Sequence, residues 1–525
     1  MRSRRIRQAL TPLLAVSALG VLTPAVAATP ASAASGGAAV TAAGTLERFT
    51  EQRVDWRSCG KGYPAAARCA TLSVPLDYRA PGGKTIEIAV SRSKATDPGK
   101  RRGALFLNQG GPGGTGVDFP YYDILKLPKS VKERYDLIGF DPRGVGQSTP
   151  IACGLRPQER EFHLPYKPET FAHDMAVTRT TADRCRAKYG TDLGQFTTRN
   201  TARDMDVIRA VLGERKLSYL GYSYGTYLGA VYTQLFPHRS DRVILDSAID
   251  PKLTWRKDHL LYGSEVEKAF DRWARWTAER SDTYGLGTTP KAVSDTFWRI
   301  VARADRAPIV TGGIPLTGDE IRRNMQPVFS SAAGAAEKVA MLKRAAAGKP
   351  TEGLPGARDL FSDAASSLLL AVHCGDGGWP RDPETYRKDA IRDKARYPLY
   401  GDHAANISPC AFWDRPVERP TRVENDVPAM ILQNEWDPAT PLIGARGLRE
   451  DMRGSRLVVV DEGEGHGVYA TGRNACVDQL TTAYLVHGRL PSADRTCRVE
   501  TPRQRLDSNE GTPSTLATPG LPFRR

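Results

Sequence analysis

The sequence predicts an α/β fold with a mostly parallel central sheet and a helical cap inserted between sheet strands. Short apolar runs bounded by Gly and Pro alternate with helical segments in the first half of the chain and return near its end. Such runs are typical of strands that are buried on both faces of a parallel sheet. Between residues 252 and 423 the strand patterns disappear and helical spacing dominates, which predicts the cap.

The individual elements follow from local patterns. A helix over residues 201–212 is expected to begin at Thr201 as N-cap, with Asp204 three positions later, and to stop before Gly213. Another helix should follow the strand that ends at residue 221. In the insertion, helical spacing covers residues 265–280 and 337–347. The expected strands are residues 85–91, 104–107, 135–140, 217–221, 242–245, 429–433 and 457–461.

The cap would lie over the carboxyl ends of the strands, where α/β sheets carry their binding sites. By composition, the chain as a whole divides into six segments. The segments are a signal peptide (1–33), a flexible or pro-segment (34–49), the first part of the core (50–251), the cap (252–423), the second part of the core (424–505) and a flexible tail (506–525).

The N-terminus has the pattern of an export signal. Four arginines precede an apolar stretch over residues 9–26 and two small-residue cleavage patterns. A membrane anchor is the alternative, but this stretch is short and broken by prolines. The pair Arg4-Arg5 leaves twin-arginine export open beside the general route. We expect a secreted, extracellular protein, with association to the cell envelope as a variant of the same location.

The charge and the cysteines limit the partners. The formal charge is +15, or +11 without the four N-terminal arginines, but acids lie between the basic residues throughout. No basic stripe with interleaved aromatics is present, so we expect a basic surface and no nucleic-acid partner. Eight cysteines in an exported chain allow up to four disulfides in 105 connectivities, and no Cys-x-x-Cys pair indicates zinc. Neighbour pairing is the simplest hypothesis: 59–69, 153–185, 374–410 and 476–497.

A candidate nucleophile lies between a strand and a helix, in the sequence Gly221-Tyr222-Ser223-Tyr224-Gly225. A serine in such a strand–turn–helix setting is exposed on a sharp turn, as a nucleophile requires. Gly-x-Ser-x-Gly alone could be a structural turn, because small residues are common in loops. The flanking strand and helix favour the nucleophile.

A serine hydroxyl needs a base and a residue that orients the base, in the chain order Ser, Asp, His. Asp437 and His466 each follow a predicted strand, and His466 lies between two glycines. Glu435 is the nearest alternative acid. His373 and His403 are alternative bases, but both lie in the insertion.

A Gly-rich loop, Asn108-Gln109-Gly110-Gly111-Pro112-Gly113-Gly114, follows the strand over residues 104–107. Backbone N–H groups that glycine leaves unshielded can stabilise a developing oxyanion, and we expect the donors to be Gly111 and Tyr224. No Gly-Lys-Ser/Thr follows, which excludes a phosphate loop. A dinucleotide-binding fingerprint is also absent. No metal or organic cofactor is predicted.

These motifs resemble a known family. The Gly-rich loop, the segment Asp141-Pro142-Arg143-Gly144-Val145-Gly146-Gln147-Ser148 and the Ser223 motif are similar to the proline-iminopeptidase branch of α/β hydrolases. Within it, residues 50–500 resemble secreted tripeptidyl aminopeptidases of actinobacterial type. The resemblance implies an α/β-hydrolase fold, a Ser223–Asp437–His466 triad and a small C-terminal module around the acid and the base. Gln109 stands where iminopeptidases carry His, which suits the tripeptidyl group.

The resemblance implies the release of short peptides, often tripeptides, from free N-termini of peptides and proteins. We expect the enzyme to be a monomer. A protonated amine must pair with acids of the cap, and Asp376 is the first candidate, followed by Glu265 and Glu267. Two alternatives remain at this point. An esterase or lipase would use the same triad with an apolar cap, and an inactive hydrolase could serve as an envelope-binding protein.

Overall fold

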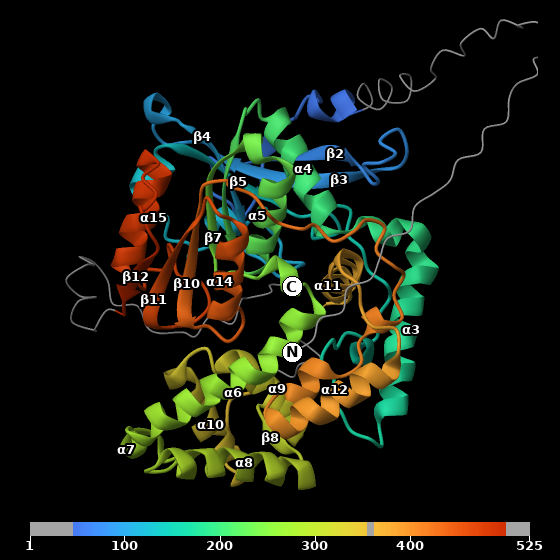
Figure 1. Cartoon of the computed structure of the whole chain (residues 1–525), viewed down its shortest axis with the longest axis vertical. Helices are drawn as coiled ribbons and strands as arrows, with labels where there is room; N and C mark the ends of the chain where they lie inside the picture. Colours follow the sequence, from blue (N-terminus) through green and yellow to red (C-terminus); the bar gives the residue numbers. More distant parts are fainter. Residues whose placement is uncertain (1–45, 354–361, 500–525) are drawn as a thin grey trace, which may run out of the picture.

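A ten-stranded sheet forms the core of the computed structural model, which describes residues 46–353 and 362–499 (Figure 1). The predicted signal peptide, most of the 34–49 segment and the C-terminal tail lie outside the described residues. The strand order is β1-β2-β3-β5-β4-β6-β7-β10-β11-β12. The strands are β1 (Arg57–Ser58), β2 (Arg68–Pro75), β3 (Thr85–Ser93), β4 (Gly103–Asn108), β5 (Tyr135–Phe140), β6 (Leu217–Tyr222), β7 (Ser240–Asp246), β10 (Ala429–Trp436), β11 (Arg456–Glu464) and β12 (Arg495–Arg498).

The strands from β5 to β12 run parallel, whereas β1, β2 and β3 pair antiparallel at one edge. Every residue of β4 and β5 is buried, as the apolar runs predict for central parallel strands. The strands β1, β2 and β12 were not predicted from the sequence. All three lie toward the edges of the sheet, where exposed and half-buried polar residues interrupt the apolar pattern.

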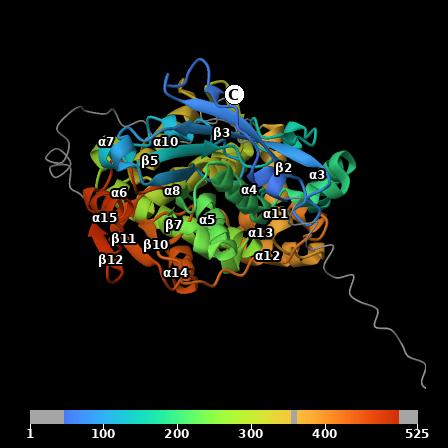
Figure 2. The same cartoon turned by 90° about the horizontal axis from the view of Figure 1, so that it is seen from above.

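Helices cover both faces of the sheet (Figure 2). One layer contains α4 (Thr198–Val211), α5 (Tyr224–Leu235) and α14 (Leu442–Asp451), whose apolar residues join one core cluster with Phe106 of β4. The other contains α2 (Lys129–Lys132) and α15 (Ala475–His487), which pack in a second cluster with Leu105. Adjacent residues of one strand thus point into different cores, as the period of a strand requires.

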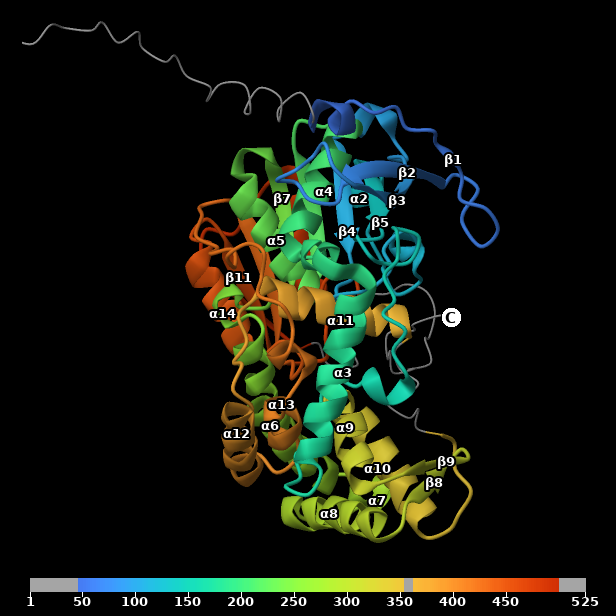
Figure 3. The same cartoon turned by 90° about the vertical axis from the view of Figure 1, so that its right-hand side faces the viewer.

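A helical cap is inserted between β7 and β10 and has a hydrophobic core of its own around Trp273, Phe297 and Phe329 (Figures 1 and 3). It also holds a hairpin, β8 (Ile309–Thr311) with β9 (Ile314–Leu316), so the expectation of a strand-free insertion was wrong. Three-residue strands are too short to produce a clear alternation. The cap helices are α6 (Arg256–Ala278), α7 (Ser281–Tyr284), α8 (Pro290–Arg306), α9 (Gly318–Val328), α10 (Ala332–Ala346), α11 (Asp363–Asp376), α12 (Pro383–Arg396) and α13 (Gly401–Ala405).

One long helix from the first part of the core extends along the cap. α3 (Phe171–Tyr189) runs from the sheet toward the cap helices (Figure 3). Its Asp174 accepts a hydrogen bond from Asn406 at 3.3 Å, and its Arg186 pairs with Asp414 at 3.0 Å. The cap is therefore attached to the core by this helix as well as by its own two connections.

The four disulfides join the neighbouring cysteines, which confirms that hypothesis: Cys59–Cys69, Cys153–Cys185, Cys374–Cys410 and Cys476–Cys497. Among the residues described, no helix is long and apolar enough to cross a membrane.

The helix predicted from Thr201 begins three residues earlier, and its N-cap is Thr197, whose hydroxyl accepts from the Asn200 N–H. Asp204, expected near the helix start, instead forms a buried ion pair with Arg143. The guanidinium donates to both carboxylate oxygens at 2.6 and 2.7 Å, and Tyr78 donates a third bond at 2.8 Å. This pair attaches α4 to the loop after β5.

We expect Asp204→Asn to lower the free energy of unfolding by about 3 kcal/mol, because it leaves the buried Arg143 charge without its counter-ion. Chemical denaturation followed by circular dichroism measures the change. Asp183→Asn is the control, since Asp183 pairs with Arg186 at the surface, and surface pairs contribute little. Equal midpoints for the two variants would contradict the assignment.

Candidate active site

Ser223 lies at the sharp turn between β6 and α5, with φ 57° and ψ −125°. A non-glycine residue in this region is strained, and such strain is concentrated at functional sites. The turn depends on Gly221, because a Cβ there would lie 2.5 Å from the carbonyl oxygen of Gly225 and from the ring of Tyr219. The side chain of Ser223 is therefore held at the carboxyl end of the sheet, partly exposed.

His466 and Asp437 are in direct contact. Nδ1 of His466 lies 2.7 Å from Oδ2 of Asp437, whose side chain is fully buried. The carboxylate also accepts the N–H groups of Ala439 and Thr440 and the hydroxyl of Thr440, at 2.9, 3.2 and 2.9 Å. These bonds fix the carboxylate so that it can orient the imidazole, with Nδ1 occupied and Nε2 left for chemistry.

The alternative acid and bases lie elsewhere. Glu435 accepts the N–H of Glu462 at 2.8 Å. His373 and His403 are buried among aromatic rings of the cap, and burial lowers the pKa of each to about 3. Both histidines therefore stay neutral near pH 7.

The loop that carries His466 is fixed on three sides. Asn434 of β10 donates to the carbonyl oxygens of Gly465 and Gly467 at 2.9 and 3.4 Å. The hydroxyl of Tyr222, next to Ser223, donates to the carbonyl of Tyr469 at 2.8 Å. The third side is the end of β7, where Asp246 accepts backbone N–H groups of the loop.

The pKa of His466 is raised above its ordinary value. Burial by itself lowers it, but the charge and the hydrogen bond of Asp437, together with the charge of Asp246, outweigh burial. This arrangement stabilises the imidazolium, the form that a general base reaches when it has taken a proton.

The Gly-rich loop lies directly against the Ser223 turn. A Cβ on Gly110, which has φ +100°, would lie 2.6 Å from the Tyr222 carbonyl oxygen, 2.9 Å from the Ser223 Cβ and 3.2 Å from the Tyr224 nitrogen. The N–H of Gly110 itself donates to the Asn108 side chain at 3.0 Å. The next residue, Gly111, is exposed and directly follows the glycine that packs against the Tyr224 nitrogen.

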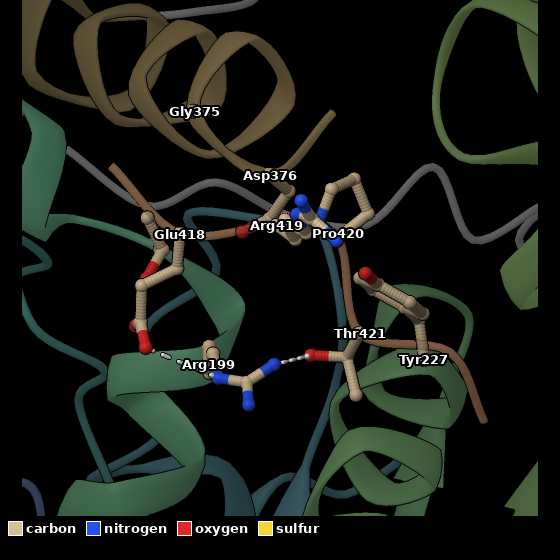
Figure 4. Close-up of a pocket in the computed structure, with 9 residues that line it drawn as sticks. Arg199, Tyr227, Gly375, Asp376, Glu418, Arg419, Pro420 and Thr421 are labelled. Atoms are coloured by element: carbon tan, nitrogen blue, oxygen red, sulfur yellow. Dashed lines mark hydrogen bonds and ion pairs between the residues drawn. The ribbon is translucent and has the colours of Figure 1, made fainter. Parts of the chain in front are cut away.

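The three candidate acids for the amine have different surroundings. Asp376 ends α11, and its carboxylate accepts the N–H and the hydroxyl of Thr198 at 2.8 and 2.5 Å. It borders a small pocket that also contains Arg199 and Glu418 (Figure 4). Burial raises the pKa of Asp376 to about 7, although both bonds from Thr198 oppose this.

Glu265 and Glu267 lie on α6. Glu265 pairs with Lys268 at 2.7 Å. Glu267 accepts the N–H of Leu399 at 2.6 Å, and burial raises its pKa to about 7. The two acids are two positions apart and thus point in different directions from the helix.

The cap contacts the loops of Asp437 and His466 through α6. Arg272 forms an ion pair with Glu464, two residues before His466, and its guanidinium lies 5.2 Å from the ring centre of Trp436, next to Asp437. Glu464 also accepts the N–H of Ala332, the first residue of α10, at 3.1 Å. Burial raises the pKa of Tyr262, and the negative charge of Asp437 adds to this effect.

The residues that hold Asp437 and the His466 loop in place were not predicted from the sequence. Thr440 lies in the Asp-Pro-Ala-Thr-Pro segment beside Asp437, and a hydroxyl three residues after an acid is a recognisable local pattern. Asn434 and Asp246 are far from His466 in sequence. A polar residue at the end of an otherwise apolar strand was the available signal for both.

Comparison with known proteins is consistent with this geometry. A family model described as alpha/beta hydrolase fold matches residues 103–294, and one described as TAP-like protein matches residues 397–497. The tripeptidyl aminopeptidase of Streptomyces lividans is 35% identical over 488 residues, which cover 88% of this chain and 89% of that protein.

Two further relatives match over a similar share of the chain. The serine protease Hip1 of Mycobacterium tuberculosis (strain H37Rv) is 32% identical, over 85% of this chain and 91% of that protein. Carboxylesterase B of Mycobacterium tuberculosis (strain CDC 1551) is 29% identical, over 84% of this chain and 89% of that protein. The chain therefore belongs to the α/β-hydrolase family that contains the tripeptidyl aminopeptidase of Streptomyces lividans and the serine protease Hip1.

Proposed function

We propose that this protein is a secreted serine exopeptidase that releases short peptides, in particular tripeptides, from free N-termini of peptides and proteins. The observation that carries the proposal is the buried Asp437–His466 contact of 2.7 Å behind a strained Ser223. The named activity of the Streptomyces lividans relative supports the substrate class. The four disulfides support an oxidising, extracellular location.

The mechanism is acyl transfer. Ser223 attacks the scissile carbonyl while Nε2 of His466 takes its proton, and the N–H groups of Gly111 and Tyr224 hold the tetrahedral oxyanion. His466 then protonates the leaving amine, which leaves the released peptide as an ester on Ser223. Water, deprotonated by the same imidazole, hydrolyses this ester and restores the enzyme.

Recognition of the N-terminus requires an acid near the catalytic loops, and Glu265 is the candidate that its position favours. Residues 262, 265 and 272 share one face of α6, because they are spaced three, seven and ten apart. Arg272 on this face pairs with Glu464, and the pKa of Tyr262 on the same face is raised by burial and by the charge of Asp437. Asp376 and Glu267 are the weaker candidates, since backbone N–H groups occupy them, whereas Glu265 pairs with the exposed side chain of Lys268.

We expect Glu265→Gln to lower kcat/KM for a free-amine tripeptide substrate by about 10- to 100-fold, the equivalent of one charge-assisted hydrogen bond. Hydrolysis of an activated ester, which has no amine to bind, should stay unchanged. Glu267→Gln is the matched control on the same helix. Equal losses on both substrates would assign Glu265 a structural role instead.

The substrate class is tested with three matched chromogenic substrates: a tripeptide with a free N-terminus, the same tripeptide N-acetylated, and a short-chain ester. We expect the purified enzyme to cleave the free tripeptide at least ten times faster than the acetylated one. Equal cleavage of both peptides would indicate an endopeptidase. Cleavage of the ester alone would indicate an esterase, a second candidate that the similarity to carboxylesterase B favours.

A further inference from the structure

Asp246, the last residue of β7, binds the loop of His466 through consecutive backbone groups. Its fully buried carboxylate accepts the N–H of Val468 at 3.0 Å and that of Tyr469 at 2.7 Å. The hydroxyl of Ser247 donates to the same carboxylate at 3.2 Å and accepts the N–H of Gly467 at 2.8 Å. Three successive N–H groups after His466 thus end on one carboxylate–hydroxyl pair.

The backbone of Asp246 also contacts the nucleophile. Its carbonyl oxygen accepts the N–H of Ser223 at 2.9 Å. Ser223 and Ser247 both have positive φ, 57° and 62°, at the ends of the adjacent strands β6 and β7. Strained residues persist only where their surroundings over-determine them, and here Asp246 joins the two strained turns.

The carboxylate acts on His466 electrostatically as well. Its negative charge raises the pKa of His466, whereas Arg473 lowers it. Burial raises the pKa of Asp246 to about 7, although the N–H groups of the loop and the His466 charge oppose this. The other titratable groups that face Asp246 or its loop are Tyr222, Tyr469 and Asp478, and burial raises the pKa of both tyrosines.

We propose that Asp246 is a positioning residue that holds the His466 loop beside Ser223 and stabilises the imidazolium by its negative charge. The proposal rests on the acyl-transfer function proposed above. Asp437 contacts the imidazole directly, whereas Asp246 acts through the backbone of residues 467–469 and through space. A charged anchor at this position would support the base in every acyl-transfer step, whatever the leaving group.

Asp246→Asn removes the charge but keeps one acceptor oxygen, which at the Oδ2 position can still accept the N–H groups of Val468 and Tyr469. We expect kcat to fall about tenfold with KM unchanged. We also expect the acid limb of the kcat/KM–pH profile to move to lower pH, by at most about one unit, since loss of a nearby negative charge lowers the pKa of His466 and Asp246, with a pKa of about 7, is partly protonated on that limb. The readout is hydrolysis of the activated ester, which needs the triad and no N-terminal recognition.

Asp141→Asn is the matched control. Asp141 is a buried acid at the end of β5 that accepts three backbone N–H groups, from Gly116, Val117 and Gln147. These N–H groups belong to the loops after β4 and β5 and not to the His466 loop. Its loss should lower the melting temperature and leave the acid limb in place.

Ser247→Ala is the second arm, which keeps the carboxylate and removes only the bond to Gly467. We expect a severalfold lower kcat and an unmoved acid limb. An unmoved limb in Asp246→Asn, or an unchanged kcat in Ser247→Ala, would overturn the proposal. If the wild type hydrolyses the ester but cleaves no peptide, the peptidase function is overturned and the role of Asp246 can still be tested on the ester. If the wild type hydrolyses neither substrate, the proposed function and the proposed role of Asp246 are both overturned.

Discussion

Replacing Asp437 by asparagine is expected to lower kcat by about 10⁴-fold, the order of loss that follows when an orienting carboxylate becomes an amide. The amide would still fit among Ala439, Thr440 and His466, but its NH₂ group cannot accept the Nδ1–H of the imidazole. His466 would then be held in the tautomer that presents no lone pair to Ser223. Steady-state kinetics on the free tripeptide measures the change.

Glu435→Gln is the control for this prediction. Glu435 is two residues from Asp437 in sequence but accepts the N–H of Glu462 instead. We expect its kcat to stay within about twofold of the wild type, because most substitutions away from such special features have small effects. A large loss for Glu435→Gln and a small one for Asp437→Asn would exchange the roles of the two acids.

Gly110→Ala is expected to lower kcat by about 10³-fold, the upper range for loss of an oxyanion-hole donor. The new Cβ would lie 2.6 Å from the Tyr222 carbonyl and 2.9 Å from the Ser223 Cβ. The carbonyl of Tyr222 and the Cβ of Ser223 cannot rotate away from the new methyl group. The Gly-rich loop must therefore move away from the Tyr224 N–H. The same peptide assay, run beside a thermal melt, separates this loss from unfolding.

Gly113→Ala provides a control with the same backbone cost. Gly113 has φ +102°, close to the +100° of Gly110, but its added Cβ would meet nothing nearer than the Ala365 carbonyl at 3.5 Å. We therefore expect a modest loss of stability and nearly full activity. Equal inactivation of both variants would show that backbone strain, not contact with the nucleophile, is responsible.

The central part of the fold was predictable because its strands are buried on both faces. The runs at residues 104–107, 135–140 and 217–221 all lie within parallel strands of the structure. Edge strands such as β2 were not predictable, since their exposed face interrupts the apolar pattern. The start of α4 was misplaced because Thr197 and Thr201 both have the side chain of an N-cap, and only the tertiary structure decides between them.

The site was predictable where chain order and local motif coincide. Asp437 and His466 follow β10 and β11, which are adjacent and parallel, so their 2.7 Å contact follows from the topology of the sheet, and Ser223 follows β6 at the same edge. The anchors of the His466 loop were not predictable. Asp246 lies 220 residues before His466, and nothing local in the sequence reveals that a strand-end carboxylate accepts N–H groups of a distant loop.

The most direct test of the account is to identify the residue that becomes acylated. Purified protein is treated with a fluorophosphonate, which reacts irreversibly with an activated serine, and is then digested and analysed by mass spectrometry. We expect one adduct, on Ser223, absent in Ser223→Ala and formed far more slowly in Asp437→Asn. An adduct on another serine, or continued peptide cleavage by Ser223→Ala, would contradict the assignment of the nucleophile and with it the proposed mechanism.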